Sequence, residues 1–204
     1  MFTPLLGLLD QLAQQPALVT LVMGAAALAE SALGLGTLTP GETMVSLGAG
    51  VLAGQPVLSL AWAAVAVGAF LGDHVGYLVG RRSGPALATG TLVRRLGAHR
   101  WQRATALIER HGVPTLVLGR LVPGVRTVLA AGAGALGMSY RRYVLAAALA
   151  ALLWSALWVG GGATMVTLVL GLGPLHALAL GAALAGVVTG IAVYRRARRA
   201  AALA

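Results

Sequence analysis

Gly119-Arg120-Leu121-Val122-Pro123-Gly124-Val125-Arg126-Thr127 is the stretch that decides how this chain folds, because it interrupts the apolar run 113–137. Proline cannot continue a helix interior and glycine weakens one, so Pro123-Gly124 predicts a break between two short helices. An arginine stands on each side of the break. A second break, Leu38-Thr39-Pro40-Gly41-Glu42, interrupts an earlier apolar run. Neither run is expected to cross a membrane as one continuous helix.

The composition places the chain in a membrane. Of its 204 residues, 58% are hydrophobic and 10% are charged, whereas a soluble domain has about 25% charged residues. The 15 basic residues are all arginines, against 5 acids, which gives a net charge of +10. These arginines cluster at the ends of apolar segments, which is typical of the cytoplasmic side of a membrane protein rather than of a nucleic-acid-binding surface.

Residues for enzyme or metal chemistry are sparse. The chain has no cysteine, so disulfides, thiolate catalysis and cysteine metal sites are excluded. Its four histidines lack ligand spacing, and Ser31, Ser46 and Ser155 have no histidine and acid near them in sequence. We therefore expect no metal site, no cofactor and no enzymatic reaction.

The lengths of the apolar segments predict the order of elements in a single membrane domain. The first half comprises an interfacial segment at 1–16, a re-entrant hairpin at 17–54, a transmembrane helix at 56–80 and a cytoplasmic loop at 81–110. The second half comprises a re-entrant hairpin at 111–138, transmembrane segments at 143–162 and 165–194, and a basic tail at 195–204. Gly173-Pro174 marks the expected start of the last helix.

The two halves resemble each other around their breaks. The stretch from Pro40 to Leu52 aligns with the stretch from Pro123 to Leu136 when one inserted residue is allowed. Either this reflects chance in a chain rich in Ala, Gly and Leu, or it reflects a duplication, and the shared Pro-Gly and Gly-Ala-Gly favour duplication. Broken segments at matching positions of two halves indicate a transport site. The predicted fold is an all-α polytopic membrane protein with two inverted repeats, each a re-entrant broken-helix hairpin followed by a transmembrane helix, plus a C-terminal transmembrane helix.

Charge supports this topology. If 56–80 crosses once and each hairpin returns to its own side, the 81–110 loop and Arg141-Arg142 share a side. Two further crossings bring the tail at 195–199 back to that side. All arginine clusters, and the C-terminus with them, are then cytoplasmic.

Four charges lie in or beside apolar segments, namely Glu30, Glu42, Arg120 and Arg126. A charge at membrane depth needs a partner, a water-filled cavity or an anionic ligand. One interpretation is a pair of internal ion pairs that hold the hairpins together. The other is a phosphate site, because arginine stays charged and its planar fork suits phosphate oxygens.

The acids have a separate predicted role. Burial of a carboxylate favours its protonated form, which suits Glu30 and Glu42 to carry protons or to hold the arginines when substrate is absent. The two acids lie across their own break and are placed to face one cavity. Asp73 is either a third proton group or a partner for Arg81, and the partner role is favoured. Gly72, Gly76 and Gly80 fall on one helix face, where they permit close packing of helices.

Several motifs resemble those of the DedA family, also called SNARE-associated or VTT-domain proteins. Glu30 with Pro40-Gly41-Glu42 resembles its first acidic motif, and residues 72–84 resemble its central glycine-rich motif. The second-half signature is matched by His111-Gly112, by 119–127 and by Gly132, Met138, Tyr143 and Trp154. The resemblance covers about residues 28–155. Tyr143 replaces a usual Phe, and alanines fill 146–151 where a polar residue often occurs, changes expected to affect packing more than chemistry.

The resemblance implies two re-entrant hairpins that face each other, and lipid transport linked to protons or to the membrane potential. It implies that the functional charges are Glu30, Glu42, Arg120 and Arg126. The expected function is a flippase that moves an anionic polyprenyl lipid phosphate, such as undecaprenyl phosphate, across the bacterial plasma membrane. Arg120 and Arg126 would bind the phosphate, and Glu30, Glu42 and Asp73 would serve proton coupling or gating. The alternatives are a proton-coupled antiporter of small cations or toxic compounds, a broad phospholipid scramblase, and a scaffold that shapes lipid packing without turnover.

Overall fold

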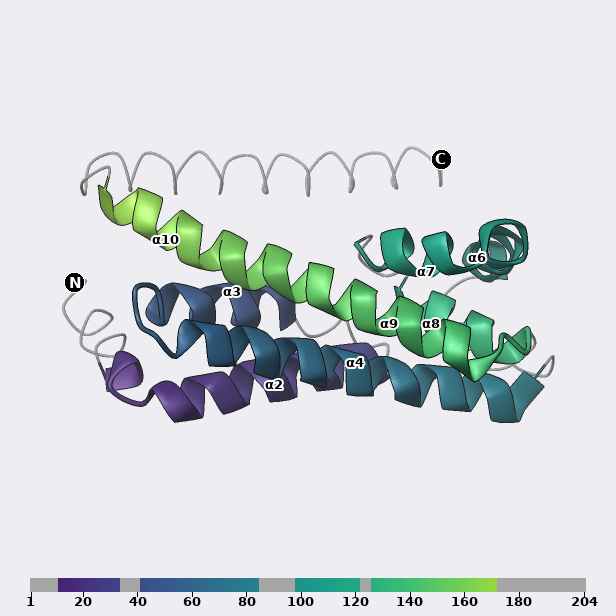
Figure 1. The fold of residues 1–204 in the computed structure, drawn as a ribbon, viewed down its shortest axis with the longest axis horizontal. Helices are drawn as coiled ribbons and strands as arrows, with labels where there is room; N and C mark the ends of the chain where they lie inside the picture. The colour runs from purple at the N-terminus through teal and green to yellow at the C-terminus, as the bar shows by residue number, and fades with distance from the viewer. Residues whose placement is uncertain (1–10, 34–40, 85–97, 122–125, 172–204) are drawn as a thin grey trace, which may run out of the picture. The chain divides into compact units, whose positions relative to one another are not determined.

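The computed structural model describes residues 11–33, 41–84, 98–121 and 126–171, and within them the chain is helical with no strand (Figure 1). This confirms the all-α prediction. The elements are α2 (Pro16–Leu33), α3 (Gly41–Val51), α4 (Leu58–Ser83), α6 (Ala98–His111), α7 (Val113–Arg120), α8 (Arg126–Ala135), α9 (Tyr140–Ser155), the π-helix η3 (Ala156–Gly160) and α10 (Gly161–Gly171). Of the predicted segments, most of 1–16, most of 165–194 and all of 195–204 lie outside the described residues.

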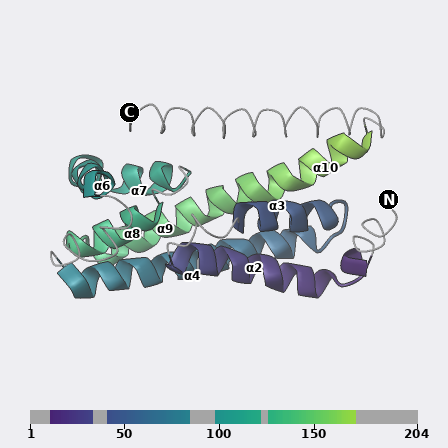
Figure 2. The same cartoon turned by 180° about the vertical axis from the view of Figure 1, so that it is seen from behind.

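The chain divides into two compact units, residues 1–163 and 164–204. Within the first unit, α2 packs along α4 through glycines (Figures 1 and 2). A methyl group on Gly68 would strike the backbone of Gly24, and one on Gly72 would lie 2.6 Å from the carbonyl oxygen of Leu28. Contacts therefore advance along both helices in the same direction, so α2 and α4 run parallel.

The helix α3 returns along α2. Gly41 lies against Glu30, and Gly48 lies against Met23, so the two helices are antiparallel on either side of residues 34–40. At 11 residues, α3 is about 16 Å long, roughly half the thickness of the hydrocarbon core of a bilayer. The helix is therefore too short to cross the core.

The second half of α4 packs on α8. A Cβ atom on Gly80 would collide with the carbonyl of Ala131, and one on Gly134 would collide with that of Tyr77. Gly72 thus faces α2, while Gly76 and Gly80 face α8. The predicted packing role of the glycine face is confirmed, and one helix uses it to hold two different neighbours.

Among the residues that the structure describes, two helices are long and apolar enough to span a membrane, Leu58–Ser83 with 26 residues and Tyr140–Val169 with 30 residues. The second differs from the prediction, which ended one segment at residue 162 and began another at 165. The helix instead runs on through η3 and Gly160-Gly161-Gly162. Gly162 fits this continuous helix because it packs directly on the backbone of Ser46, where a side chain would not fit.

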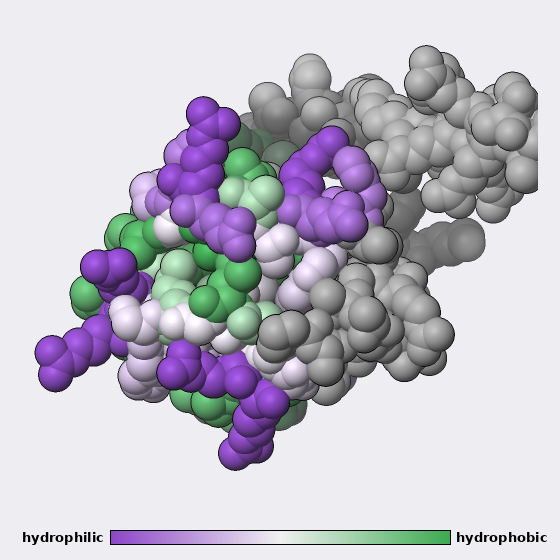
Figure 3. Space-filling model, turned by 90° about the vertical axis from the view of Figure 1, so that its right-hand side faces the viewer, coloured by the Kyte–Doolittle hydropathy of each residue, from purple (hydrophilic) through white to green (hydrophobic). Residues whose placement is uncertain are grey.

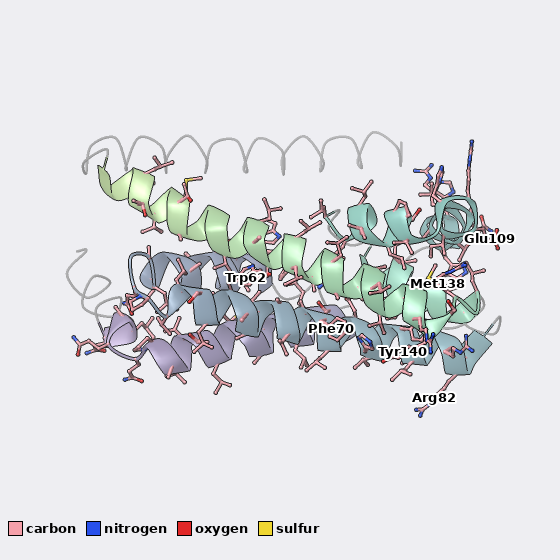
Figure 4. All side chains as sticks on the ribbon, viewed as in Figure 1. Trp62, Phe70, Arg82, Glu109, Met138 and Tyr140 are labelled. Atoms are coloured by element: carbon pink, nitrogen blue, oxygen red, sulfur yellow. The ribbon has the colours of Figure 1, made fainter. Side chains whose placement is uncertain are left out.

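Arginines gather at the end of the first unit where α4 ends and α9 begins. The Tyr77 hydroxyl donates to the Met138 carbonyl at 2.7 Å, which ties the end of α4 to the turn before α9. Figure 4 places Arg82, Met138, Tyr140 and Glu109 of α6 at this end, with Phe70 midway along α4. Arg141 and Arg142 open α9 here as well. The clusters at 81–82 and 141–142 therefore share one end, as the charge pattern predicts.

Candidate functional site

The side chain of Arg120 is the centre of the candidate site. It ends α7 and is only 3% exposed, although it carries a permanent charge. One guanidinium nitrogen forms an ion pair with the Asp73 carboxylate of α4. The other donates to the Ser31 hydroxyl of α2 at 3.2 Å. A single arginine from the second half of the chain thus joins two helices of the first half.

Close helix packing puts these partners within reach. Gly72 precedes Asp73, and a Cβ atom on it would lie 2.6 Å from the Cβ atom of Ser31. The absence of a side chain there lets α2 and α4 approach until Ser31 and Asp73 face the same guanidinium. Asp73 is 5% exposed and Ser31 is 1% exposed, so water screens the ion pair poorly and the attraction is strong.

Aromatic rings of α9 complete the surroundings of Arg120. The guanidinium carbon lies 5.6 Å from the ring centroid of Trp154, a cation–π arrangement. The Tyr143 hydroxyl donates to the Asp73 backbone carbonyl at 2.7 Å, and its ring stacks on Tyr77 at 4.1 Å. Beside Asp73 and Arg120 is a cavity of about 20 Å³, room for roughly one water molecule.

Glu30 lies next to Ser31 and is 1% exposed. Its carboxylate lies against Gly41, the first residue of α3. The N-terminus of a helix carries partial positive charge and unpaired N–H groups, so an anion is favoured there. Glu42, half-buried, follows in the first turn of α3. The idea that Glu30 and Glu42 face one cavity stays a prediction.

One predicted contact is wrong. Asp73 pairs with Arg120 rather than with Arg81, which lies near the Met138 carbonyl oxygen at 3.5 Å. Eight residues along a helix correspond to about 12 Å, and Arg81 lies in the last turn of α4, where it is exposed. Asp73 is buried and finds its partner on another helix.

Other predicted residues lie at the edge of what the structure describes. Arg126 is the first residue of α8, but its side chain lies outside the described part. Pro40, Pro123 and Gly124 also lie outside the described residues. Their predicted roles as phosphate ligand and as helix breaks stay predictions.

The sequence did not single out Ser31, Tyr143 or Trp154 as part of the site. The one sequence signal for Ser31 as a site residue is its position directly after Glu30, a charge within an apolar segment. Trp154 is part of the family resemblance, and it packs, at 1% exposure, against Arg120. Among the described residues, no group of three His, Asp or Glu side chains is placed to hold a metal ion.

Comparison with known proteins identifies the family of this chain. The VTT domain matches residues 39–164, more than half of the chain. The uncharacterized membrane protein ML0287 of Mycobacterium leprae is 38% identical over 137 residues, which cover 66% of this chain and 59% of that protein. The inner membrane protein YghB of Salmonella typhimurium is 34% identical over 142 residues, with 67% and 63% covered.

A longer match extends over most of the chain. The uncharacterized membrane protein Rv2637 of Mycobacterium tuberculosis is 34% identical over 201 residues, which cover 91% of this chain and 87% of that protein. The matches to the first two relatives span about three fifths of their lengths. No solved structure matches. The domain match, the relatives and the two membrane-length helices agree that this chain is a membrane protein of the VTT-domain, or DedA, family.

Proposed function

We propose that this protein is a lipid transporter that moves an anionic polyprenyl lipid phosphate, such as undecaprenyl phosphate, across the bacterial plasma membrane. The observation that carries the proposal is the buried Arg120, which is held by Asp73 and Ser31 among apolar helices. Burying a guanidinium in an apolar bundle is expensive, so intramembrane charges of this kind mark substrate pathways. The planar fork of arginine also matches phosphate oxygens in pairs.

In this proposal, Asp73 occupies the guanidinium when no lipid phosphate is present. The phosphate displaces the carboxylate, because both anions compete for the same donors. Protonation of Asp73 would weaken its hold on Arg120 and so favour the exchange, which links transport to protons. Glu30 against the start of α3 would act in the same way at a second anion site.

The helix arrangement supports two re-entrant hairpins. The antiparallel pair α2 and α3 would form the first, and α7 with α8 the second. The helices α3, α7 and α8 have 11, 8 and 10 residues, each too short to cross about 30 Å of hydrocarbon. We propose that these hairpins are inverted repeats that enter from opposite faces, with the arginine-rich end cytoplasmic.

The relatives support the location. One is named an inner membrane protein, and we place this chain in the bacterial plasma membrane with its C-terminus in the cytoplasm. The partners are then a membrane lipid and protons. The proposed cycle breaks no covalent bond, so the protein is a transporter and not an enzyme.

A proton-coupled antiporter for small cations or toxic compounds is the second candidate. It is favoured by the three acids Glu30, Glu42 and Asp73, two of which are buried. In that case the acids bind the cargo and Arg120 is a gate. Broad phospholipid scrambling is a variant of the first proposal, because it uses the same phosphate chemistry with less selectivity.

Flipping of a fluorescent polyprenyl phosphate in proteoliposomes tests the proposal. We expect wild-type protein to flip the lipid, and Arg120→Ala to slow flipping about tenfold or more, because one charge-assisted contact to phosphate is worth that much. Arg120→Lys should also impair flipping, since the planar fork is lost. Arg82→Ala is the matched control, because Arg82 is exposed at the end of α4.

Either of two results would contradict the proposal. Normal flipping by Arg120→Ala would remove Arg120 from the phosphate site. Absence of flipping by the wild-type protein at every pH and membrane potential would favour the cation antiporter. Phosphatidylcholine carrying the same fluorophore in parallel liposomes separates a polyprenyl phosphate flippase from a broad scramblase.

A further inference from the structure

A groove of about 660 Å³ lies between α6 and α7, within the range of roughly 300–1,000 Å³ typical of ligand pockets. One wall is a face of α6 that carries His99, Arg103, Leu107 and His111 at four-residue spacing. The opposite wall is α7, and Val128 and Leu129 of α8 form the floor. We refer to this cavity as the α6–α7 groove.

A tight corner holds the two walls together. Gly112 joins α6 to α7 with a φ of 60°, a backbone conformation that favours glycine. The Thr115 hydroxyl then donates to the Leu107 carbonyl at 2.9 Å across the corner. The α6–α7 groove is therefore a built feature of the fold.

The lining of the α6–α7 groove combines an apolar interior with positive charge. Leu107, Leu118 and Leu129 provide hydrocarbon surface. Arg103 lies on the α6 wall with one guanidinium nitrogen 3.1 Å from the His99 ring nitrogen. In the described part of the chain no acidic side chain lines it, and Glu109, the acid of α6, is exposed elsewhere on that helix. Figure 3 looks onto the end of the molecule that carries α6, where hydrophilic side chains surround hydrophobic ones.

The α6–α7 groove adjoins the Arg120 site. Leu129 lines both the groove and the small cavity beside Asp73 and Arg120. It also packs directly against Gly119, the neighbour of Arg120 in α7. Leu129 is 2% exposed, and it is the residue that the linings of the two cavities share.

We propose that the α6–α7 groove binds an anionic membrane lipid, with its phosphate at Arg103 and His99 and a hydrocarbon chain along Leu107 and Leu118. This inference rests on the proposed function, for which it supplies the site where the lipid waits before its phosphate reaches Arg120. Basic pockets between helices on the cytoplasmic side of membrane proteins bind anionic headgroups. The apolar interior selects the chain, and the cationic wall selects the charge.

Binding of fluorescent phosphatidic acid to the detergent-solubilised full-length protein tests the proposal, with diacylglycerol of the same chains, which carries no phosphate, as reference. Leu118→Trp fills the groove and should weaken binding of both lipids about tenfold, since it removes apolar contact between the groove and a lipid hydrocarbon chain. Arg103→Ala should weaken binding of phosphatidic acid alone, by about tenfold. The matched controls are Leu145→Trp, at a leucine of α9 that is 72% exposed, and Arg82→Ala.

Wild-type affinity for both lipids in Leu118→Trp would overturn the proposal, and equal losses for both lipids in Arg103→Ala would overturn the headgroup site. Leu118 is 65% exposed, so folding should tolerate tryptophan there. Leu107→Trp fills the groove from the opposite wall and must give the same loss. Gel filtration verifies that each variant is folded.

Flipping assays on the same variants separate the two proposals. If the groove is wrong and the transport proposal right, Leu118→Trp binds and flips lipid like wild type while Arg120→Ala flips it about tenfold or more slowly. If transport is wrong and the groove right, the groove variants lose binding although the wild-type protein flips nothing. If both proposals are right, Leu118→Trp slows flipping although Arg120 is intact.

Discussion

At the scale of single residues, the described chain buries three charged side chains, Glu30, Asp73 and Arg120. The sequence singles out Glu30 and Arg120, because charges within apolar segments are costly to keep, whereas it favours Arg81 as the partner of Asp73. It does not predict how they pair, since Asp73 and Arg120 are 47 positions apart and meet only through packing of α4 and α7. The sequence does not predict the contact made by Tyr143 either. Its hydroxyl reaches the backbone of Asp73, so replacing the usual Phe affects more than packing.

The first prediction concerns Asp73→Asn. Removing one partner of a buried ion pair is strongly destabilising, by about 3–5 kcal/mol in soluble proteins. We therefore expect a lower melting temperature for the purified protein in detergent. Glu109→Gln, at an exposed acid of α6, should melt like wild type. Equal melting of Asp73→Asn and wild type would mean that the ion pair does not stabilise the fold.

The double variant Asp73→Leu with Arg120→Met separates structure from transport. Replacing both members of a buried pair by apolar residues is often neutral or stabilising, so the melting temperature should recover. Flipping should stay absent, because the phosphate ligand is gone. Recovery of both would assign the pair a purely structural role.

At the scale of helices, the glycine pattern of α4 is readable from sequence, but the identity of its neighbours is not. Spacing of four places Gly72, Gly76 and Gly80 on one face, and the structure divides that face between α2 and α8. The predicted segment ends at residue 162, yet the helix continues through residues 160–162. Gly162 packs there on the backbone of Ser46 in α3, a contact that the sequence does not reveal.

The second prediction compares two glycines in helices. Gly80→Ala places a methyl group against the carbonyl of Ala131, and because backbone atoms cannot move aside, α4 and α8 must separate. We expect a loss of about 1–3 kcal/mol, as for overpacked cores, seen as a lower melting temperature. Gly161→Ala is the control, because nothing lies within 4 Å of the added atom. Its stability should be unchanged or raised by up to about 1 kcal/mol, and equal effects at both positions would contradict close packing of α4 on α8.

At the scale of the whole molecule, the distribution of arginines predicts which ends of helices lie on one side of the membrane. The structure ties the end of α4 to the start of α9 through Tyr77 and Met138, which puts Arg81-Arg82 and Arg141-Arg142 together. An α4 of 26 residues is about 39 Å long, enough to cross the hydrocarbon core. If α4 crosses the membrane, its first residues lie on the side opposite these arginines.

The third prediction uses the absence of cysteine from the chain, which lets single introduced thiols report sidedness without background. Ser83→Cys and Ser139→Cys lie at the arginine-rich end, and Ser59→Cys lies at the start of α4, all at exposed positions. In intact bacterial cells with a permeabilised outer membrane, we expect an impermeant maleimide to label Ser59→Cys alone. The other two should react only after the plasma membrane is opened, since we propose that the arginine-rich end is cytoplasmic. Labelling of all three thiols from outside would mean that α4 does not cross the membrane. Labelling of Ser83→Cys and Ser139→Cys alone would mean that the topology is the reverse of the one proposed, with the α6–α7 groove on the outer face.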